Sequence, residues 1–247
     1  MSKRKAILIE CSNTPKQDDL PGCKNDVSNW RKFLTSSLGG SWDSSEIPEL
    51  SSTPTKTEVF DEINKENVDY LFLAFSGHGC NCDDEDYIHL KDCIIKVSEI
   101  EEYVRKKAKK ACFVIDACRS NIEQSDLQII QQRLDESAGG KLTNIQWWDY
   151  LNKQKEGIVK IFACEKTQTT RNLPLVKYPS CGGVFTTSLI KAASTWAEKK
   201  VFSGEIFDTK LAFYSACLCA SIVFGEKVSN PVYMSNPQYL DYPFAVV

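Results

Sequence analysis

Four short apolar runs, separated by stretches with helical periodicity, constrain the fold of this chain most strongly. They are residues 6–9, 70–75, 111–115 and 157–163. Continuous apolar runs of this length are typical of strands that are buried on both faces of a parallel sheet. Because helical stretches lie between them, the pattern predicts crossover units. It therefore predicts one α/β domain with a largely parallel sheet flanked by helices.

The segments between and after these runs carry the remaining elements. Helices are predicted over residues 25–38, from capping-box patterns at residues 55–58 and 98–101, and over residues 186–199 and 207–224. The Pro- and Asn-rich residues 229–237 lead to a last short strand over residues 239–244. Residues 119–156 interrupt the alternation of strands and helices, and they indicate a long connection with some helix in it. Trp147 and Trp148 in this connection are either a packing pair or an anchor for a partner.

Composition excludes several classes of partner and location. The chain has 247 residues, 30 Lys or Arg and 33 Asp or Glu, and a net charge of −3. Without a basic field, neither nucleic acid nor an anionic membrane is an expected partner. The apolar residues 211–224 are too few to span a bilayer, and the first residues lack the apolar core of a secretory signal. Eleven scattered cysteines, an odd number, favour free thiols in a reducing cytoplasm over a disulfide framework.

A histidine and a cysteine follow two of the predicted strands. His78 stands between two glycines directly after the second run, and Cys118 follows the third. Functional residues of parallel α/β sheets gather just beyond the carboxyl ends of strands. If these two strands are neighbours, His78 and Cys118 lie within reach of one another across a cleft.

That pairing suits thiol catalysis. A cysteine at its ordinary pKa is mostly protonated at neutral pH, and a neighbouring imidazole activates it as a nucleophile. The amides of Gly79 and Cys118 are candidates to donate to a developing oxyanion. Taken singly, each residue has a structural interpretation: His78 as a strand-end histidine in a glycine turn, and Cys118 as a buried thiol. The joint pattern favours catalysis.

These motifs resemble those of a known family. Residues 76–79 (SGHG) and 116–120 (DACRS) are similar to the catalytic segments of caspase-like cysteine peptidases, and more closely to those of metacaspases and their prokaryotic relatives. Relative to the caspase signature Q-A-C-[RQG]-G, this chain has Asp116 for glutamine, Ser120 for glycine, and a His–Cys separation of 40 residues. Residues 20–26 (LPGCKND), 183–186 (GVFT) and 236–239 (NPQY) also resemble family segments, so the likeness covers nearly the whole chain.

The resemblance implies a fold and a division of the chain. It implies a caspase-like three-layer α/β sandwich with a mostly parallel, six-stranded sheet. Residues 1–247 would form a single catalytic domain, with a large-subunit-like part (1–120), a connecting segment (121–156) and a small-subunit-like part (157–247). It further implies peptide cleavage through an acyl-enzyme, with Cys118 as nucleophile and His78 as general acid/base.

The resemblance also implies a specificity pocket. The metacaspase positions that line an acidic pocket correspond here to Asp116, Asp26, Cys23 and Ser76. Two carboxylates facing one pocket repel each other unless a cation lies between them, and a guanidinium meets them with bidentate hydrogen bonds. We therefore expect cleavage after Arg, with Lys second. The alternatives are a helix N-cap for Asp26 and a purely structural role for Asp116.

The loop after His78 raises the question of a metal. Cys80 and Cys82 form H-x-C-x-C with His78, but this spacing is unlike that of closed zinc sites. Its acidic residues could help to bind calcium, which activates several metacaspases, yet the short His–Cys separation leaves little room for the calcium loop of the family. A solvated acidic loop, with no required cofactor and no metal, is the expectation. We interpret His89 as an ordinary strand histidine.

Regulation is expected to involve the connecting segment and a partner. The connecting segment contains Arg133, Lys141, Lys153 and Lys155, where an Arg- or Lys-directed enzyme would cut itself. We expect protein substrates, regulated proteolysis such as cell death or defence, a monomeric state, and a separate activator or regulatory protein. The alternatives are a catalytically latent caspase-fold interaction protein and another cysteine hydrolase or transferase on a similar sheet.

Overall fold

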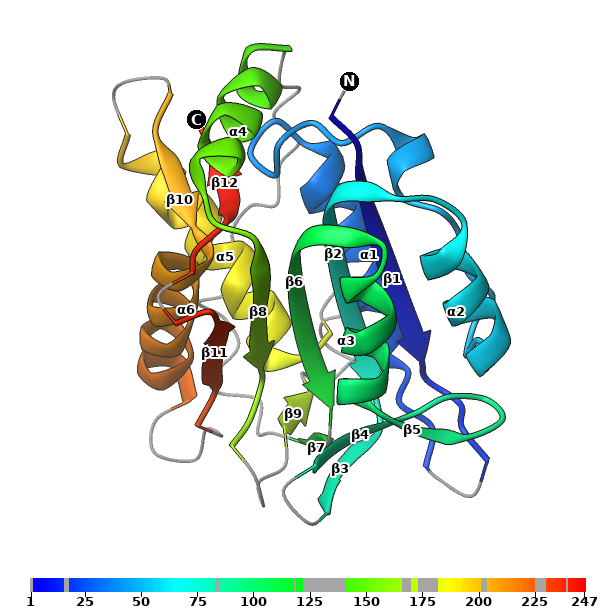
Figure 1. Cartoon of the computed structure of the whole chain (residues 1–247). Helices are drawn as coiled ribbons and strands as arrows, with labels where there is room; N and C mark the ends of the chain where they lie inside the picture. Colours follow the sequence, from blue (N-terminus) through cyan, green and yellow to red (C-terminus); the bar gives the residue numbers. More distant parts are fainter. Residues whose placement is uncertain are drawn as a thin grey trace.

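A mixed, mostly parallel sheet forms the centre of the protein (Figure 1). The computed structural model describes residues 2–15, 18–82, 85–117, 119–121, 141–165, 170–172, 182–200, 204–224, 230–238 and 240–247. Within these residues the sheet order is β1 (Arg4–Cys11), β2 (Val68–Gly77), β6 (Ala108–Ala117), β8 (Gly157–Phe162) and β11 (Val232–Asn236). The first four strands are parallel, and β11 pairs antiparallel with β8. The four apolar runs thus correspond to four adjacent parallel strands, as predicted.

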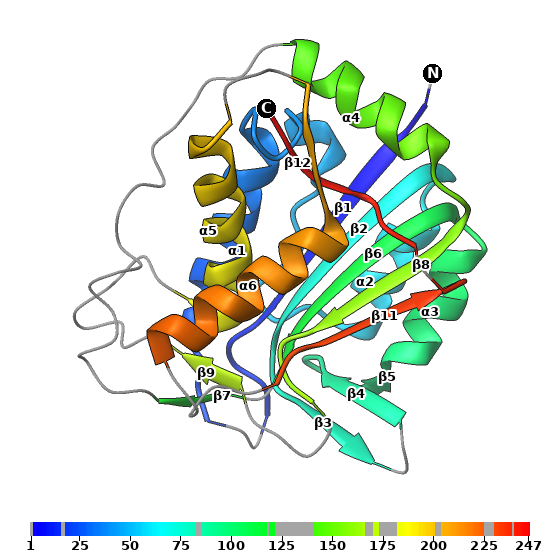
Figure 2. The same cartoon turned by 90° about the vertical axis from the view of Figure 1, so that its left-hand side faces the viewer.

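Helices cover both faces of this sheet (Figures 1 and 2). One face, called here the α5 face, carries α1 (Gly22–Thr35), α5 (Val184–Glu198) and α6 (Thr209–Phe224). The other, the α3 face, carries α2 (Lys56–Asn64) and α3 (Val97–Arg105). Successive strand residues point to opposite faces, so Ala74 and Val114 join the α5-face core while Phe75 and Ile115 join the α3-face core. This alternation tells on which of the two faces each residue at the end of β2 and β6 lies.

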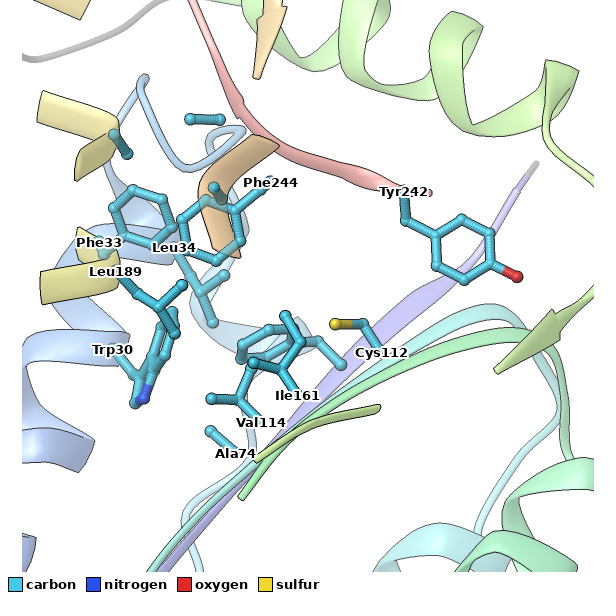
Figure 3. Packing of buried hydrophobic residues seen from close by; sticks show 14 of the residues in the cluster. Trp30, Phe33, Leu34, Ala74, Cys112, Val114, Ile161, Leu189, Tyr242 and Phe244 are labelled. Atoms are coloured by element: carbon cyan, nitrogen blue, oxygen red, sulfur yellow. The ribbon is translucent and has the colours of Figure 1, made fainter. Parts of the chain in front are cut away.

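Two aromatic residues of α1 lie in the α5-face core. Trp30 and Phe33 of α1 lie over the side chains of Val114 and Ile161 from the sheet, and Phe244 closes the cluster (Figure 3). The Trp30 ring centroid lies 5.9 Å from that of Phe244, and the two rings meet edge to face. Such pairs contribute about 0.5–1.5 kcal/mol beyond the area that they bury.

The predicted count of six strands in one sheet is not met in the described residues, which give five. The last strand, β12 (Pro243–Val246), pairs antiparallel with β10 (Ile206–Asp208) instead of extending the sheet. Tyr242, directly before β12, holds the chain at this point: its buried side chain donates a hydrogen bond to the Gly157 carbonyl, 2.9 Å away, and its amide donates to the Thr209 hydroxyl at 3.0 Å. The chain then crosses the α5 face, where the Val246 amide donates to the Leu38 carbonyl at 2.8 Å.

Several predicted boundaries are also corrected. The helix expected over residues 25–38 is α1, which begins earlier and ends at Thr35. The helix expected from residue 207 begins at Thr209, because residues 206–208 are in β10. Residues 232–236, expected to lie in a linker, form the edge strand β11.

One predicted capping box is confirmed and the other is wrong. Thr55 caps α2, and both hydrogen bonds of the box with Glu58 are present. Helix α3 begins at Val97, and its N-cap makes no side-chain hydrogen bond. Ser98 instead donates to Glu85 at 2.8 Å, because the strand that carries Glu85 packs beside the start of α3.

The segment after His78 is more ordered than predicted. It forms an antiparallel sheet of β3 (Gly79–Cys82), β4 (Glu85–His89) and β5 (Ile94–Lys96), so the solvated-loop expectation is wrong for these residues. Asp83 and Asp84 lie outside the described residues. His89 is the last residue of β4, in agreement with its interpretation as a strand histidine.

Further short elements complete the fold. Strand β7 (Arg119–Asn121) pairs in parallel with β9 (Thr170–Asn172), and a 3-10 helix, η1, covers Ser44–Glu46. In the described residues, no helix combines the length and apolarity needed to cross a membrane.

The connecting segment ends in a helix that packs into the core. This helix, α4 (Lys141–Lys153), buries Trp147 and Leu151 in the α5-face core, and Trp148 packs against it. The tryptophan pair is therefore a packing pair. Residues 122–140, with the predicted cleavage position Arg133, lie outside the described residues.

A buried arginine joins β1 to α4. The guanidinium carbon of Arg4 lies 4.3 Å from the Trp42 ring centroid and 4.8 Å from that of Trp147. Its Nε donates to Glu46 at 3.1 Å, and Nη2 donates to the Gly40 carbonyl at 3.0 Å. Stacking on two rings and an ion pair together stabilise this desolvated cation.

We predict that Arg4→Met lowers the free energy of unfolding by about 2–3 kcal/mol, because it removes the stacked cation and leaves Glu46 without its ion-pair partner. Chemical denaturation measures this loss. Lys109→Met is the matched control, because Lys109 is exposed and its Nζ lies 3.9 Å from the Asp69 carboxylate. Its expected effect is within about 0.5 kcal/mol. Equal losses in both variants would show that Arg4 has no special role.

Candidate active site

The strands that precede His78 and Cys118 are direct neighbours. In the parallel pairing of β2 with β6, Ser76 is opposite Asp116 and Gly77 is opposite Ala117. His78 and Cys118 each follow one member of the Gly77–Ala117 pair. The condition set for the dyad, that these two strands are neighbours, is therefore met. Cys118 itself lies outside the described residues.

The imidazole of His78 is oriented by a backbone carbonyl. Its Nε2 lies 2.7 Å from the Asp18 carbonyl oxygen. A carbonyl oxygen only accepts hydrogen bonds, so Nε2 is the donor and carries the proton. In the neutral ring, Nδ1 then has the free lone pair that a general base needs. The contact therefore selects the tautomer.

His89 is a second imidazole beside this site. Its backbone amide donates to the His78 carbonyl at 3.0 Å, and the ring centroids of the two histidines are 6.2 Å apart. Burial lowers the pKa of His89, and the neighbouring His78 adds to the effect. His89 is thus kept neutral while its strand positions the segment that carries His78.

Asp26 is fully buried and lies in the fifth position of α1, so the N-cap alternative is wrong. Its Oδ2 accepts a hydrogen bond from the Ser76 hydroxyl at 2.6 Å. Its Oδ1 accepts one from the Gly183 amide at 2.7 Å. Asp26 therefore links α1, the end of β2 and the start of α5.

Asp116 lies at the end of β6 and is 1% exposed. Its Oδ2 accepts hydrogen bonds from the Thr186 hydroxyl at 2.7 Å and from the Thr186 amide at 3.3 Å. Both acidic residues therefore bind the first turn of α5. Their four named donors are uncharged, and the positive end of the α5 dipole favours negative charge there.

Two consecutive glycines, Gly182 and Gly183, allow the start of α5 to lie close to the carboxylates of Asp26 and Asp116. A Cβ on Gly182 would lie 2.0 Å from Asp26 Oδ1, and one on Gly183 would lie 2.3 Å from Asp116 Oδ2. Real Cβ atoms do not come so near to other heavy atoms. The Gly182–Gly183 turn thus lies against both carboxylates, which places Asp26 and Asp116 in one cluster.

Cys23, the fourth predicted pocket residue, is buried in the first turn of α1. Its amide donates to the Leu20 carbonyl at 3.0 Å. Burial raises the pKa of the nearby Cys11 thiol, and Glu10 and Cys23 add to the effect. Deprotonation is therefore disfavoured at Cys11, as at the buried Cys112, whose pKa burial raises to about 12.

The other predicted positions fall into two groups. Gly79 is the first residue of β3, and a Cβ there would lie 2.7 Å from the Ala117 Cβ, so the peptide at Gly79 packs directly on the end of β6. The predicted cleavage positions Lys141 and Lys153 are the first and last residues of α4. Lys155 lies between α4 and β8, and its carbonyl accepts a hydrogen bond from Tyr242 at 3.2 Å.

Metal ligands are not grouped in the described part of the chain. There, no cluster of three or more His, Cys, Asp or Glu side chains is arranged to hold a metal ion. Cys80 and Cys82 are exposed on β3, and both are free thiols. Burial raises the pKa of Cys80, and Cys82 adds to the effect.

Two contributors to the site were not predicted. Asp18 binds His78 through its backbone carbonyl. Every residue type has this group, so the sequence gives no indication of the contact. Gly182 stands before the recognised GVFT segment. A glycine pair directly before an apolar helix was the available indication of a close approach there.

Comparisons with known proteins agree with this geometry. Residues 3–211 match the family described as Caspase domain. Over 90 residues the chain is 30% identical to Metacaspase-9 of Arabidopsis thaliana, a stretch that covers 32% of this chain and 28% of that relative. The chain therefore matches less than a third of the length of this curated relative.

Two solved structures share the fold. Protein GSU0716 from Geobacter sulfurreducens superposes with a TM-score of 0.60 at 17% identity, covering 99% of both chains. Caspase-1 from Spodoptera frugiperda superposes with a TM-score of 0.60 at 12% identity, covering 94% of this chain and 85% of that one. These likenesses confirm the caspase-like architecture. Since the family match runs from β1 into α6 and includes all the predicted catalytic and pocket positions, the chain belongs to the caspase-domain family of cysteine peptidases.

Proposed function

We propose that this protein is a cysteine endopeptidase that cleaves after Arg, and less efficiently after Lys, with Cys118 and His78 as a catalytic dyad. The main support for this proposal is the strand register that pairs Gly77 with Ala117. His78 and Cys118 directly follow these two residues, so both begin at the same level of the sheet edge. The dyad chemistry needs no cofactor. Activity measured with calcium and with a chelator tests that point.

One catalytic cycle of the proposed dyad consists of acylation of Cys118 and hydrolysis of the resulting thioester. His78 Nδ1 takes the thiol proton of Cys118, and the sulfur attacks the carbonyl carbon of the scissile peptide bond. The amides of Gly79 and Cys118 donate to the resulting oxyanion, each worth about 2.7–4 kcal/mol. The C–N bond then breaks as His78 returns the proton to the leaving amine. Water, deprotonated by His78, hydrolyses the thioester and regenerates the thiol.

The acidic cluster of Asp26 and Asp116 supports the preference for a basic residue. Both carboxylates are buried, both are bound by uncharged donors, and both lie on the α5 face beside the predicted dyad. Neighbouring buried carboxylates repel each other, and a substrate cation removes that repulsion. A guanidinium offers a planar set of donors for two carboxylates, whereas an ammonium acts as a point charge.

The biological setting is proposed from the family. We propose regulated proteolysis of protein substrates in the cytoplasm, in cell death or defence, under the control of a separate activator. Self-cleavage in the connecting segment would accompany activation. Helix α4 limits where such a cut can fall, because Trp147 and Leu151 anchor the helix in the core.

Replacing either member of the dyad should abolish peptidase activity. We expect Cys118→Ala and His78→Ala to lower kcat/KM for an arginyl fluorogenic peptide at least about 100-fold. An arginyl chloromethylketone should label the wild type but not Cys118→Ala. Cys93→Ala removes a partly buried thiol of the α3-face core and should retain labelling and rate. A wild type that is neither active nor labelled would favour a latent interaction protein instead.

The acidic cluster should control the residue before the scissile bond. We expect Asp116→Asn and Asp26→Asn to lower kcat/KM for arginyl peptides roughly 10- to 100-fold, because a hydrogen bond to a charged group is worth about 1.5–3 kcal/mol. The readout is the ratio of kcat/KM for Arg and citrulline peptides, which a general loss of folded protein leaves unchanged. Asp61→Asn, on the exposed side of α2, is the control. Faster cleavage of aspartyl than arginyl peptides by the wild type would contradict the assignment.

Self-cleavage should occur before the packed part of α4. We expect N-terminal sequencing of the purified wild type to reveal cuts after Arg133 or Lys141. Cuts after Lys153 or Lys155 would require unwinding the end of α4 or breaking the hydrogen bond from Tyr242. Cys118→Ala should remain a single chain. Intact chains in both proteins would contradict self-processing.

A further inference from the structure

A pocket of about 250 Å³ opens at the same sheet edge as the predicted dyad, but on the α3 face. Ile115, Ala117 and Phe162 from the ends of β6 and β8 line one side of it. These residues belong to the α3-face core or pack against it. The acidic cluster, by contrast, lies on the α5 face. The acidic cluster and this pocket are therefore separated by the end of the sheet.

The pocket reaches the backbone beside both predicted catalytic residues. Gly79, which follows His78, and Ala117, which precedes Cys118, are both in its lining. Tyr87 of β4 lies beside Gly79, and its carbonyl would be 2.7 Å from a Cβ placed on Gly79. The hairpin of β3 and β4 thus forms one wall, pressed against the end of β6.

The lining is mainly apolar. Val232 and Met234 of β11 form the opposite wall, because they alternate with Tyr233, which packs on the α5 face. The polar lining groups include the Asn81–Asp86 pair, Glu165, and the thiols of Cys80 and Cys164. The Asn81 amide is bonded to Asp86 at 2.8 Å, and Glu165 accepts a hydrogen bond from the Asn230 amide at 3.3 Å. A cavity of about 150 Å³ accommodates benzene, so this volume suffices for a large aliphatic or aromatic side chain.

We propose that this pocket binds a large apolar side chain of the substrate, that of the residue directly after the scissile bond. The inference rests on the proposed peptidase function. Successive side chains of an extended peptide point in opposite directions. If the basic side chain before the scissile bond enters the acidic cluster on the α5 face, the next side chain points to the α3 face. The pocket lies there, beside the residues that flank the dyad.

Two measurements test this inference. The first is kcat/KM for peptides with Arg before the scissile bond and Gly, Leu, Phe or Glu after it. The wild type should prefer Leu or Phe to Gly by about 10-fold or more. Val232→Trp, which fills the pocket, should reduce this ratio to about 2 or less. Ile94→Trp adds similar bulk at an exposed β5 position and should leave the ratio unchanged.

The second measurement does not need cleavage. Cys118→Ala is irradiated with an arginyl peptide that carries benzoylphenylalanine directly after the scissile bond, and the labelled residues are mapped by mass spectrometry. Labelling of Phe162, Val232 or Met234 supports the pocket as the binding site. Val232→Trp should lose this labelling, and Ile94→Trp should keep it.

The outcomes separate this inference from the proposed function. Cleavage after Arg with equal rates for Gly, Leu and Phe, and labelling elsewhere, overturns the pocket assignment and leaves the peptidase intact. Absence of cleavage with specific labelling of the pocket supports the binding site and contradicts the peptidase. Absence of both overturns both. Thermal denaturation with free indole serves as a control beside these two measurements. A rise in melting temperature without any peptide preference would identify a small-ligand site and also overturn the substrate assignment.

Discussion

Two buried carboxylates hold the first turn of α5 against the carboxyl edge of the sheet. The N-cap of α5 is Gly183, which has no side chain with which to cap the helix. Asp26 from α1 and Asp116 from β6 supply acceptors instead, for the amides of Gly183 and Thr186. Because α5 follows the connecting segment and α1 precedes it, these bonds join the two parts of the chain at the site.

The arrangement also bears on the proposed specificity pocket. Desolvated carboxylates close to one another are unfavourable, and hydrogen bonds together with a helix dipole offset that cost. Under the proposed function, a substrate guanidinium would add a favourable interaction with both groups. The two carboxylates that hold α5 in place would then also select the substrate. Glycines at positions 182 and 183 are required because a Cβ at either position would collide with a carboxylate oxygen of Asp26 or Asp116.

Much of this fold was predictable, and the omissions have physical causes. The parallel strands are visible because burial on both faces makes their runs continuously apolar. Strand β11 cannot be recognised in the sequence in this way, because it is a half-exposed edge strand with Asn, Pro and Ser around it. The course of β12 is held by long-range bonds, such as those of Tyr242 with Gly157 and of Val246 with Leu38, which no local pattern encodes. For the same reason the motif located His78, but the carbonyl of Asp18 that orients it was found only in the structure.

Strand parity links the acidic cluster to the apolar pocket. Along β6, Asp116 continues the α5-face series that includes Val114, while Ala117 continues the α3-face series that includes Ile115. Two adjacent residues therefore face opposite sides at the point where the strand ends, one charged and one small. Under the proposals made above, the same alternation in an extended substrate would match a basic side chain to one side and an apolar side chain to the other. A single-residue shift in the register of β2 on β6 would separate Ser76 from Asp116 and Gly77 from Ala117, and would remove both matches at once.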